Sequence, residues 1–311
     1  METREFDAAL PVLKGCRKAL GRIGIALALA FGLSQGVALG LVVLLDRFAP
    51  GSMENQWVSL AVGTLPIYLL GMPAAALVMR KMPAAYPLEI RRVGFGATAA
   101  FVLSAYTLFY VSQTLTLMGM EALERLTSRD YANALDQLVE PTSPATFVVI
   151  GLLGPIMEEL LFRGLVLRRL LPYGRVFAIV VSAGMFSLFH GNFFQMGYAF
   201  AVGLALAYIT VRTGSMVHAV VMHVWFNTYS TFLAFMLEKN EMAATAGAAV
   251  IMAAAAAGIV VLWRKRKTIA YHLRPAPIEA ERTLLQVVKS PGMWLYALLC
   301  VGTGIYFLIG I

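Results

Sequence analysis

Long apolar runs separated by short polar connections dominate this chain. A helix that crosses the hydrocarbon core of a membrane needs about 20 mostly apolar residues. The fifth and sixth of the runs are short and nearly contiguous, so the pattern predicts eight or nine spans. Backbone N–H and C=O groups in lipid must be satisfied within the protein, so the expected fold is all-α, a polytopic transmembrane helical bundle. The runs lie at 23–45, 58–78, 93–118, 146–170, 176–194, 195–211, 215–237, 242–263 and 292–311.

The composition agrees with lipid as the surrounding solvent. Hydrophobic residues make up 59% of the 311 residues and charged residues 14%, with a mean hydropathy of +0.75. Soluble domains carry about 25% charged residues, so a soluble chain is excluded. The net charge of +8 is spread over short clusters between the apolar runs. This spread favours lipid headgroups as the basic residues' partners and predicts no nucleic-acid binding.

The charged connections also predict an orientation. Basic clusters alternate with acidic or mixed loops, and with nine spans the alternation is unbroken. The positive-inside rule then places the N-terminus in the cytoplasm and the C-terminus outside. The Gly- and Ala-rich helices suit a prokaryotic plasma membrane. The basic clusters lie at 14–22, 80–92, 168–175, Arg212 and 264–267, and the acidic or mixed loops at 46–54, 121–140 and 238–241.

Three parts of the chain are distinguished by their polar content. Residues 1–145 hold an N-terminal cytoplasmic segment, three transmembrane helices and an external loop. Residues 146–237 form a transmembrane core with ionisable side chains. Residues 238–311 add C-terminal transmembrane helices joined by a basic cytoplasmic linker, expected at 268–289.

Two adjacent carboxylates stand within an apolar run, in EELLFR at 158–163. Ionisable groups at membrane depth are costly and usually mark function. Glu159 and Arg163 are four residues apart on one helix face and are expected to form an ion pair. Glu158 points about 100° away and has no local partner. An unpaired carboxylate in apolar surroundings suits a general base near neutral pH, so Glu158 is the catalytic candidate and Glu159–Arg163 a structural support.

Three of the four histidines lie in apolar segments after the glutamate pair. His223 and Asn227 share a helix face, and both can donate hydrogen bonds to an oxygen on which negative charge develops. His190 closes FSLFH at 186–190, and alone it would be interpreted as a hydrogen-bonded interior histidine. His218 is interpreted as a packing residue, and His272 falls in the predicted linker.

These three motifs resemble the CPBP (CAAX protease and bacteriocin-processing, or Abi) intramembrane peptidases, which include the type II CAAX prenyl endopeptidases. The family pattern is EExxxR, then FxxxH, then HxxxN or HxxxB. The corresponding runs are EELLFR at 158–163, FSLFH at 186–190 and HVWFN at 223–227. The resemblance covers roughly residues 150–235, and the motifs occur in order with no departure.

The resemblance implies a role for each residue. Glu158 would activate the attacking water with help from His190, and His223 and Asn227 would stabilise the oxyanion. Glu159 and Arg163 would hold the first helix in register. Metal dependence stays open: Glu158, His190 and His223 would make a three-ligand set for a divalent metal such as zinc, but the chain has no HExxH motif. Chemistry without a metal is slightly favoured.

The sequence therefore predicts an intramembrane endopeptidase that hydrolyses a peptide bond of a membrane-associated peptide or protein. The alternative is a non-catalytic scaffold or a transporter, because buried Glu, Arg and His also build proton and transport pathways. A scaffold would not need Glu158, His190, His223 and Asn227 together, and paired broken helices in two related halves, as in transporters, are not evident. Substrate identity and oligomeric state are left open.

Overall fold

The computed structural model describes residues 2–85, 93–133, 139–273 and 280–309, and most of these residues are helical, with no strand among them. Within them, eight helical segments are long and apolar enough to cross a membrane. The predicted fold class, a polytopic helical bundle, is confirmed. The segments are Pro11–Phe48, Gln56–Met79, Phe95–Thr127, Pro144–Tyr173, Phe193–Thr213, Val217–Lys239, Glu241–His272 and Pro291–Ile309.

The fifth predicted run, 176–194, forms a shorter helix, α9 (Arg175–Phe189), with 15 residues. At about 1.5 Å per residue it is roughly 22 Å long, less than the hydrocarbon thickness of about 30 Å. Asn192 caps the next helix, α10 (Phe193–Thr213), by accepting a hydrogen bond from the backbone N–H of Phe194 at 2.9 Å. The turn between α9 and α10 is therefore at 190–192, earlier than the predicted boundary at 194.

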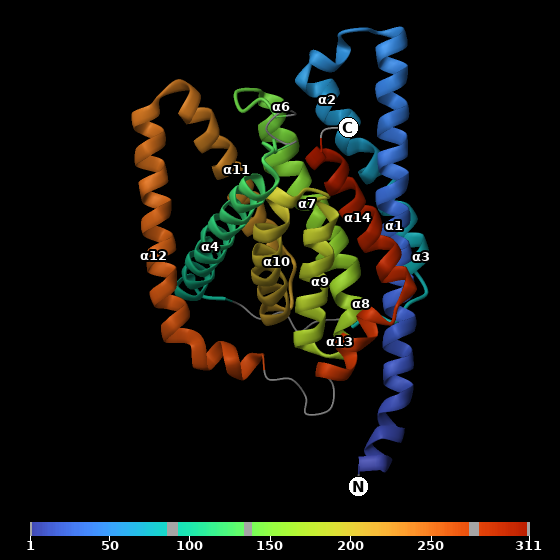
Figure 1. The fold of residues 1–311 in the computed structure, drawn as a ribbon. Helices are drawn as coiled ribbons and strands as arrows, with labels where there is room; N and C mark the ends of the chain where they lie inside the picture. Colours follow the sequence, from blue (N-terminus) through green and yellow to red (C-terminus); the bar gives the residue numbers. More distant parts are fainter. Residues whose placement is uncertain (1, 86–92, 134–138, 274–279, 310–311) are drawn as a thin grey trace.

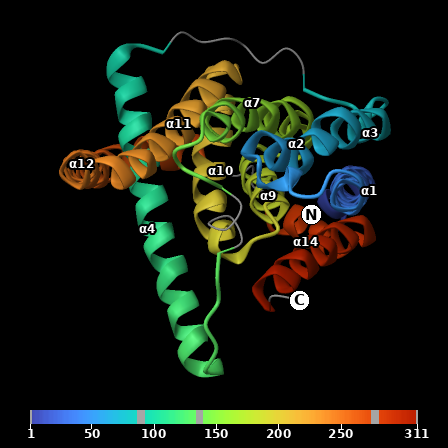
Figure 2. The ribbon, with the colours of Figure 1, turned by 90° about the horizontal axis from the view of Figure 1, so that it is seen from above.

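The helices form two packed groups (Figures 1 and 2). The first core joins α1, α3, the Pro144–Tyr173 segment, α9 and α14, and the second joins α4, α10, α11 and α12. Helix α10 packs against both α9 and α4, so it links the two groups. The bounds not yet given are α1 (Glu2–Phe48), α2 (Gln56–Pro66), α3 (Met72–Met79), α4 (Phe95–Thr127), α11 (Val217–Lys239), α12 (Glu241–His272) and α14 (Pro291–Ile309).

Two polar segments are more helical than the sequence predicted. The N-terminal segment is not separate from the first span, because α1 is continuous from Glu2 to Phe48. In the predicted linker at 268–289, α12 continues to His272 and α13 (Ala280–Val288) adds a short helix, while residues 274–279 lie outside the described part. Prolines and charges indicated a linker here, but α13 can bury residues such as Thr283 and Gln286 on one side.

The segment that carries EELLFR is not a regular α-helix. Short α-helical pieces alternate with two π-helical stretches, η3 (Phe147–Leu153) and η4 (Leu160–Leu167). Wide π-helical turns are rare and often occur at functional sites. The α-helical pieces of this segment are α6 (Pro144–Thr146), α7 (Gly154–Glu159) and α8 (Arg168–Leu170), followed by a 3₁₀ turn at Leu171–Tyr173. Elsewhere in the described residues, a 3₁₀ turn is present at Ser52–Glu54, and a π-helical stretch, Ile67–Gly71, joins α2 to α3.

Candidate active site

The ion pair expected from the EELLFR spacing is present and fully buried. Arg163 Nε lies 3.1 Å from Glu159 Oε2, and both side chains are 0% exposed. Arg163 Nη2 also donates to the carbonyl of Gly203 at 3.1 Å, and the guanidinium lies 4.7 Å from the ring centroid of Phe186. Arg163 thus links the segment that carries EELLFR, Pro144–Tyr173 (called the motif helix below), to α10 and α9, and also contacts Glu159.

His223 brings α11 to the same cluster. Its Nδ1 is 2.9 Å from Glu159 Oε1, and its Nε2 is 3.7 Å from Glu158 Oε2. Only 5% of His223 is exposed. If Nδ1 carries a proton it donates to Glu159, which fixes the ring and turns Nε2 towards Glu158. One histidine from a distant helix therefore stands between the two adjacent carboxylates.

The two carboxylates differ as the helix geometry predicted. Glu159 has partners on both oxygens, Arg163 and His223. Glu158 keeps 28% of its side chain accessible. Within the described part of the chain, its buried Oε2 accepts no hydrogen bond. Glu158 is therefore the more accessible of the two carboxylates, whereas Glu159 is fully enclosed beside Arg163 and His223.

Helix α11 approaches the motif helix through small residues and carbonyl groups of η3. A Cβ placed on Gly151 would lie 3.3 Å from Thr228 Oγ1, so a larger residue would push α11 away. Thr228 Oγ1 donates to the carbonyl of Gly151 at 3.1 Å, and Asn227 Nδ2 donates to the carbonyl of Ile150 at 3.1 Å. Asn227 is thus positioned by η3, one helical turn from His223, and one Nδ2 proton remains for another acceptor.

His190 reaches the site through a ring contact. Its Nδ1 is 2.9 Å from the carbonyl of Phe186, and the His190 and Phe186 ring centroids are 4.9 Å apart. The same phenyl ring also contacts His223, with the ring centroids 5.7 Å apart.

The structure thus brings most of the predicted site residues together. Glu158, Glu159, Arg163 and His223 form one contact cluster. The described residues show no direct ion pair between His190 and Glu158; His223 is the imidazole that faces Glu158. His218 lies apart from the cluster: among the described residues its Nδ1 has no hydrogen-bond partner.

The donor set was compared with the needs of a divalent metal. In the described ranges no three His, Cys, Asp or Glu side chains converge with metal-ligand spacing. Glu159 is committed to Arg163, and His190 Nδ1 faces a backbone carbonyl. The side chains as placed do not fit the predicted Glu158–His190–His223 metal set, and we derive no step through a metal.

Two contributors to the site were not given a role from the sequence. Phe186 contacts Arg163, His190 and His223 with one ring; its position at the start of FSLFH was the available signal. Tyr68, in the π-helical stretch between α2 and α3, interacts electrostatically with Glu158. No sequence motif around Tyr68 pointed to it, because its approach to Glu158 depends on how the Gln56–Met79 segment packs against the Pro144–Tyr173 segment.

Comparison with known proteins supports a peptidase. A family model described as Type II CAAX prenyl endopeptidase Rce1-like matches residues 140–229. This segment is less than a third of the chain and contains the three motifs, so the predicted family resemblance is confirmed there. No curated protein and no solved structure matches the chain.

Proposed function

We propose that this chain is an intramembrane endopeptidase in which Glu158 and His223 act on a water molecule and a peptide carbonyl. The observation that carries the proposal is the pair formed by Glu158 Oε2 and His223 Nε2, 3.7 Å apart. The carboxylate oxygen accepts no hydrogen bond from the described residues. Glu159 holds the other side of the imidazole, so Nε2 is turned towards Glu158, and we place the attacking water beside this pair.

The proposed reaction is hydrolysis by a general base. Glu158 removes a proton from water as the water oxygen forms a bond with the scissile carbonyl carbon. Charge then develops on the carbonyl oxygen, and N–H donors of protonated His223 and of Asn227 stabilise it. When the C–N bond breaks, Glu158 returns the proton to the leaving nitrogen. Water is thus split between the new carboxylic acid and the new amine.

The burial of Glu159 and Arg163 supports the roles proposed for Glu158 and His223. Glu159 and Arg163 are fully buried and bind each other. Their contact with His223 orients the imidazole that faces Glu158, so they are positioning residues. His190 packs on Phe186 beside His223. We propose that His190 helps Glu158 to activate the attacking water, as the family resemblance implies.

The substrate is proposed to be a membrane-associated peptide or protein whose scissile bond reaches the depth of Glu158. The family description names prenylated CAAX proteins as the substrates of its members. A farnesylated peptide with a C-terminal CAAX sequence is therefore the first probe. The same peptide with a palmitoyl anchor in place of the farnesyl group tests whether any lipid anchor is sufficient.

The test uses the full chain in lipid vesicles with both peptides, together with mapping of new peptide termini in membranes of cells that express it. Glu158→Gln and His223→Gln are expected to lower the cleavage rate by about a hundred- to ten-thousand-fold, the range of general acid–base catalysis. Their thermal unfolding should stay cooperative, which separates lost chemistry from lost folding.

Matched controls lie on the same helix as His223. Glu238→Gln changes an exposed carboxylate near the end of α11, and His218→Gln changes a histidine one and a half turns before His223. Both should retain activity. Wild-type cleavage by Glu158→Gln, or identical peptide termini with and without Glu158, would favour the scaffold or transporter. Dialysis against a chelator tests the metal separately.

A further inference from the structure

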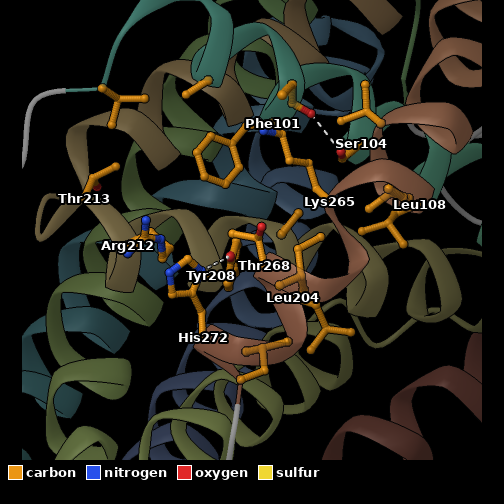
Figure 3. Close-up of a pocket in the computed structure, with 18 of the residues that line it drawn as sticks. Phe101, Ser104, Leu108, Leu204, Tyr208, Arg212, Thr213, Lys265, Thr268 and His272 are labelled. Carbon is orange, nitrogen blue, oxygen red and sulfur yellow. Dashed lines mark hydrogen bonds between the residues drawn. The ribbon is translucent and has the colours of Figure 1, made fainter.

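A cavity lies between α4, α10 and α12, and none of the residues of the glutamate–histidine cluster lines it (Figure 3). Its volume is about 700 Å³, within the range of small-molecule sites. Helices α9 and α11 complete its walls. Nothing in the proposed peptidase mechanism uses this cavity, although Met222 in its wall directly precedes His223.

Most of the cavity wall is apolar. Leu108 of α4, Val180 of α9 and Leu204 of α10 are typical of its lining, and Figure 3 shows Leu108 and Leu204 towards the end away from Arg212. Such a wall accommodates a hydrocarbon chain and offers few hydrogen bonds. This part of the cavity therefore suits an acyl chain better than a peptide backbone or a sugar.

The other end of the cavity is basic. Figure 3 shows Arg212, Tyr208 and His272 gathered there, and Lys265 borders the same cavity. The Tyr208 hydroxyl is 3.3 Å from His272 Nδ1 and also interacts with Arg212. The described lining includes no Asp or Glu. In that part of the chain neither Arg212 nor Lys265 forms an ion pair with a carboxylate.

The basic end coincides with helix ends that face the membrane surface. Arg212 is in the last turn of α10, and Lys265 belongs to the run Arg264–Lys267 near the end of α12. The first turn of α4 also lines the cavity, through Gly96 and Ala97. Helix N-terminal N–H groups favour anions, so they add to the two cationic side chains.

We propose that this cavity binds an anionic glycerophospholipid of the cytoplasmic leaflet. The phosphate would contact Arg212 and Lys265, and one acyl chain would lie along the α4–α10 wall. The charge distribution along the chain predicts that this side is cytoplasmic, where basic pockets between transmembrane helices bind acidic headgroups. The apolar part of the lining suits the acyl chain and the cationic part suits the phosphate, and both parts belong to the same cavity.

The proposal can be tested with photoreactive lipids. The full chain is reconstituted in vesicles that contain phosphatidylglycerol or phosphatidylcholine with a diazirine in one acyl chain, and the cross-linked peptides are mapped by mass spectrometry. Cross-links from phosphatidylglycerol are expected in residues 95–108 and 261–273. Lys265→Gln and Arg212→Gln should each lower their yield about five-fold, the effect of losing about 1 kcal/mol per basic residue.

Controls separate this cavity from general attraction to the membrane. Arg264→Gln and Lys267→Gln alter exposed basic residues that do not line the cavity and should leave the yield unchanged. Gly96→Leu should block cross-linking by filling the cavity. Gly119→Leu, on the same helix with open space around it, should have no effect.

Two results would overturn the proposal. The first is equal labelling of residues 95–108 by both lipids, since it would show a groove that takes any acyl chain. The second is an unchanged yield in Lys265→Gln: this side chain is exposed, so the variant is expected to fold even if Arg212→Gln does not.

Discussion

Two glutamate–arginine pairs in this protein have the same four-residue spacing and different surroundings. Arg125 and Glu121, near the end of α4, are 2.6 Å apart with side chains 77% and 59% exposed. Arg163 and Glu159 are 3.1 Å apart and fully buried. The exposed pair has water as an alternative partner for both charges. The buried pair has only its protein neighbours, so each additional contact affects stability.

This difference shows how a buried charge is retained. Removing ions from water is costly, and the cost is offset only when other groups complete their coordination. Glu159 gains His223, and Arg163 gains the carbonyl of Gly203 and the face of Phe186. Hydrogen bonding is still incomplete, because within the described residues Glu158 Oε2, Glu159 Oε2 and Arg163 Nε have no hydrogen-bond partner. Glu158 differs from Glu159 in exposure, since it keeps 28% of its side chain accessible.

The largest expected effect comes from removing the buried cation. Arg163→Met would leave the fully buried Glu159 without its cationic partner, with His223 as its remaining contact within the described residues. We expect a loss of about 3–5 kcal/mol in the free energy of unfolding, as for other broken buried pairs. Denaturant or thermal unfolding in lipid nanodiscs measures it. The double variant Glu159→Gln with Arg163→Met should recover part of the loss; wild-type stability in Arg163→Met would contradict the proposed support role.

Removing the buried anion should have a smaller effect on stability. In Glu159→Gln, Glu158 still interacts electrostatically with Arg163, and the amide oxygen can accept from His223 Nδ1. We expect a loss of about 1–3 kcal/mol, the usual cost of a poorly satisfied buried group.

Activity should respond more strongly than stability in the same variant. Glu158 would be drawn to the unpaired arginine and His223 would lose its anionic partner, so the cleavage rate should fall at least about ten-fold. Steady-state cleavage of the lipid-anchored peptide measures this fall. An unchanged rate constant for Glu159→Gln would remove Glu159 from the positioning role.

The smallest expected effect is at the exposed pair. Glu121→Gln should change the free energy of unfolding by less than about 0.5 kcal/mol, because solvent-exposed pairs at this spacing contribute little. The measurement is the same unfolding curve, which makes it a direct control for the buried variants. A loss as large as that of Glu159→Gln would show that spacing, rather than burial, determines the contribution.

The sequence predicted the features that depend on local geometry. Hydropathy located the spans, four-residue spacing predicted the pair of Glu159 and Arg163, and the 100° offset distinguished Glu158. Features that depend on packing between distant helices were not predicted. The contact of His223 with both carboxylates, 2.9 Å from Glu159 and 3.7 Å from Glu158, is one of them. That approach depends on small Gly151 and the exposed carbonyls of η3, which hydropathy does not reveal.

The short helix α9 bears on how a hydrolase inside a membrane is hydrated. In the proposed reaction, each cleaved peptide bond consumes one water molecule, which would have to cross an apolar layer to reach Glu158. Helix α9 ends roughly 22 Å along its axis, and the turn after it carries His190 and Asn192. Asn192 Nδ2 donates to Asn133 Oδ1 at 2.8 Å, so amide groups from two distant segments meet at this turn. In the proposed reaction, a polar turn reached after roughly 22 Å of helix would shorten the apolar part of the path from bulk water to the scissile bond.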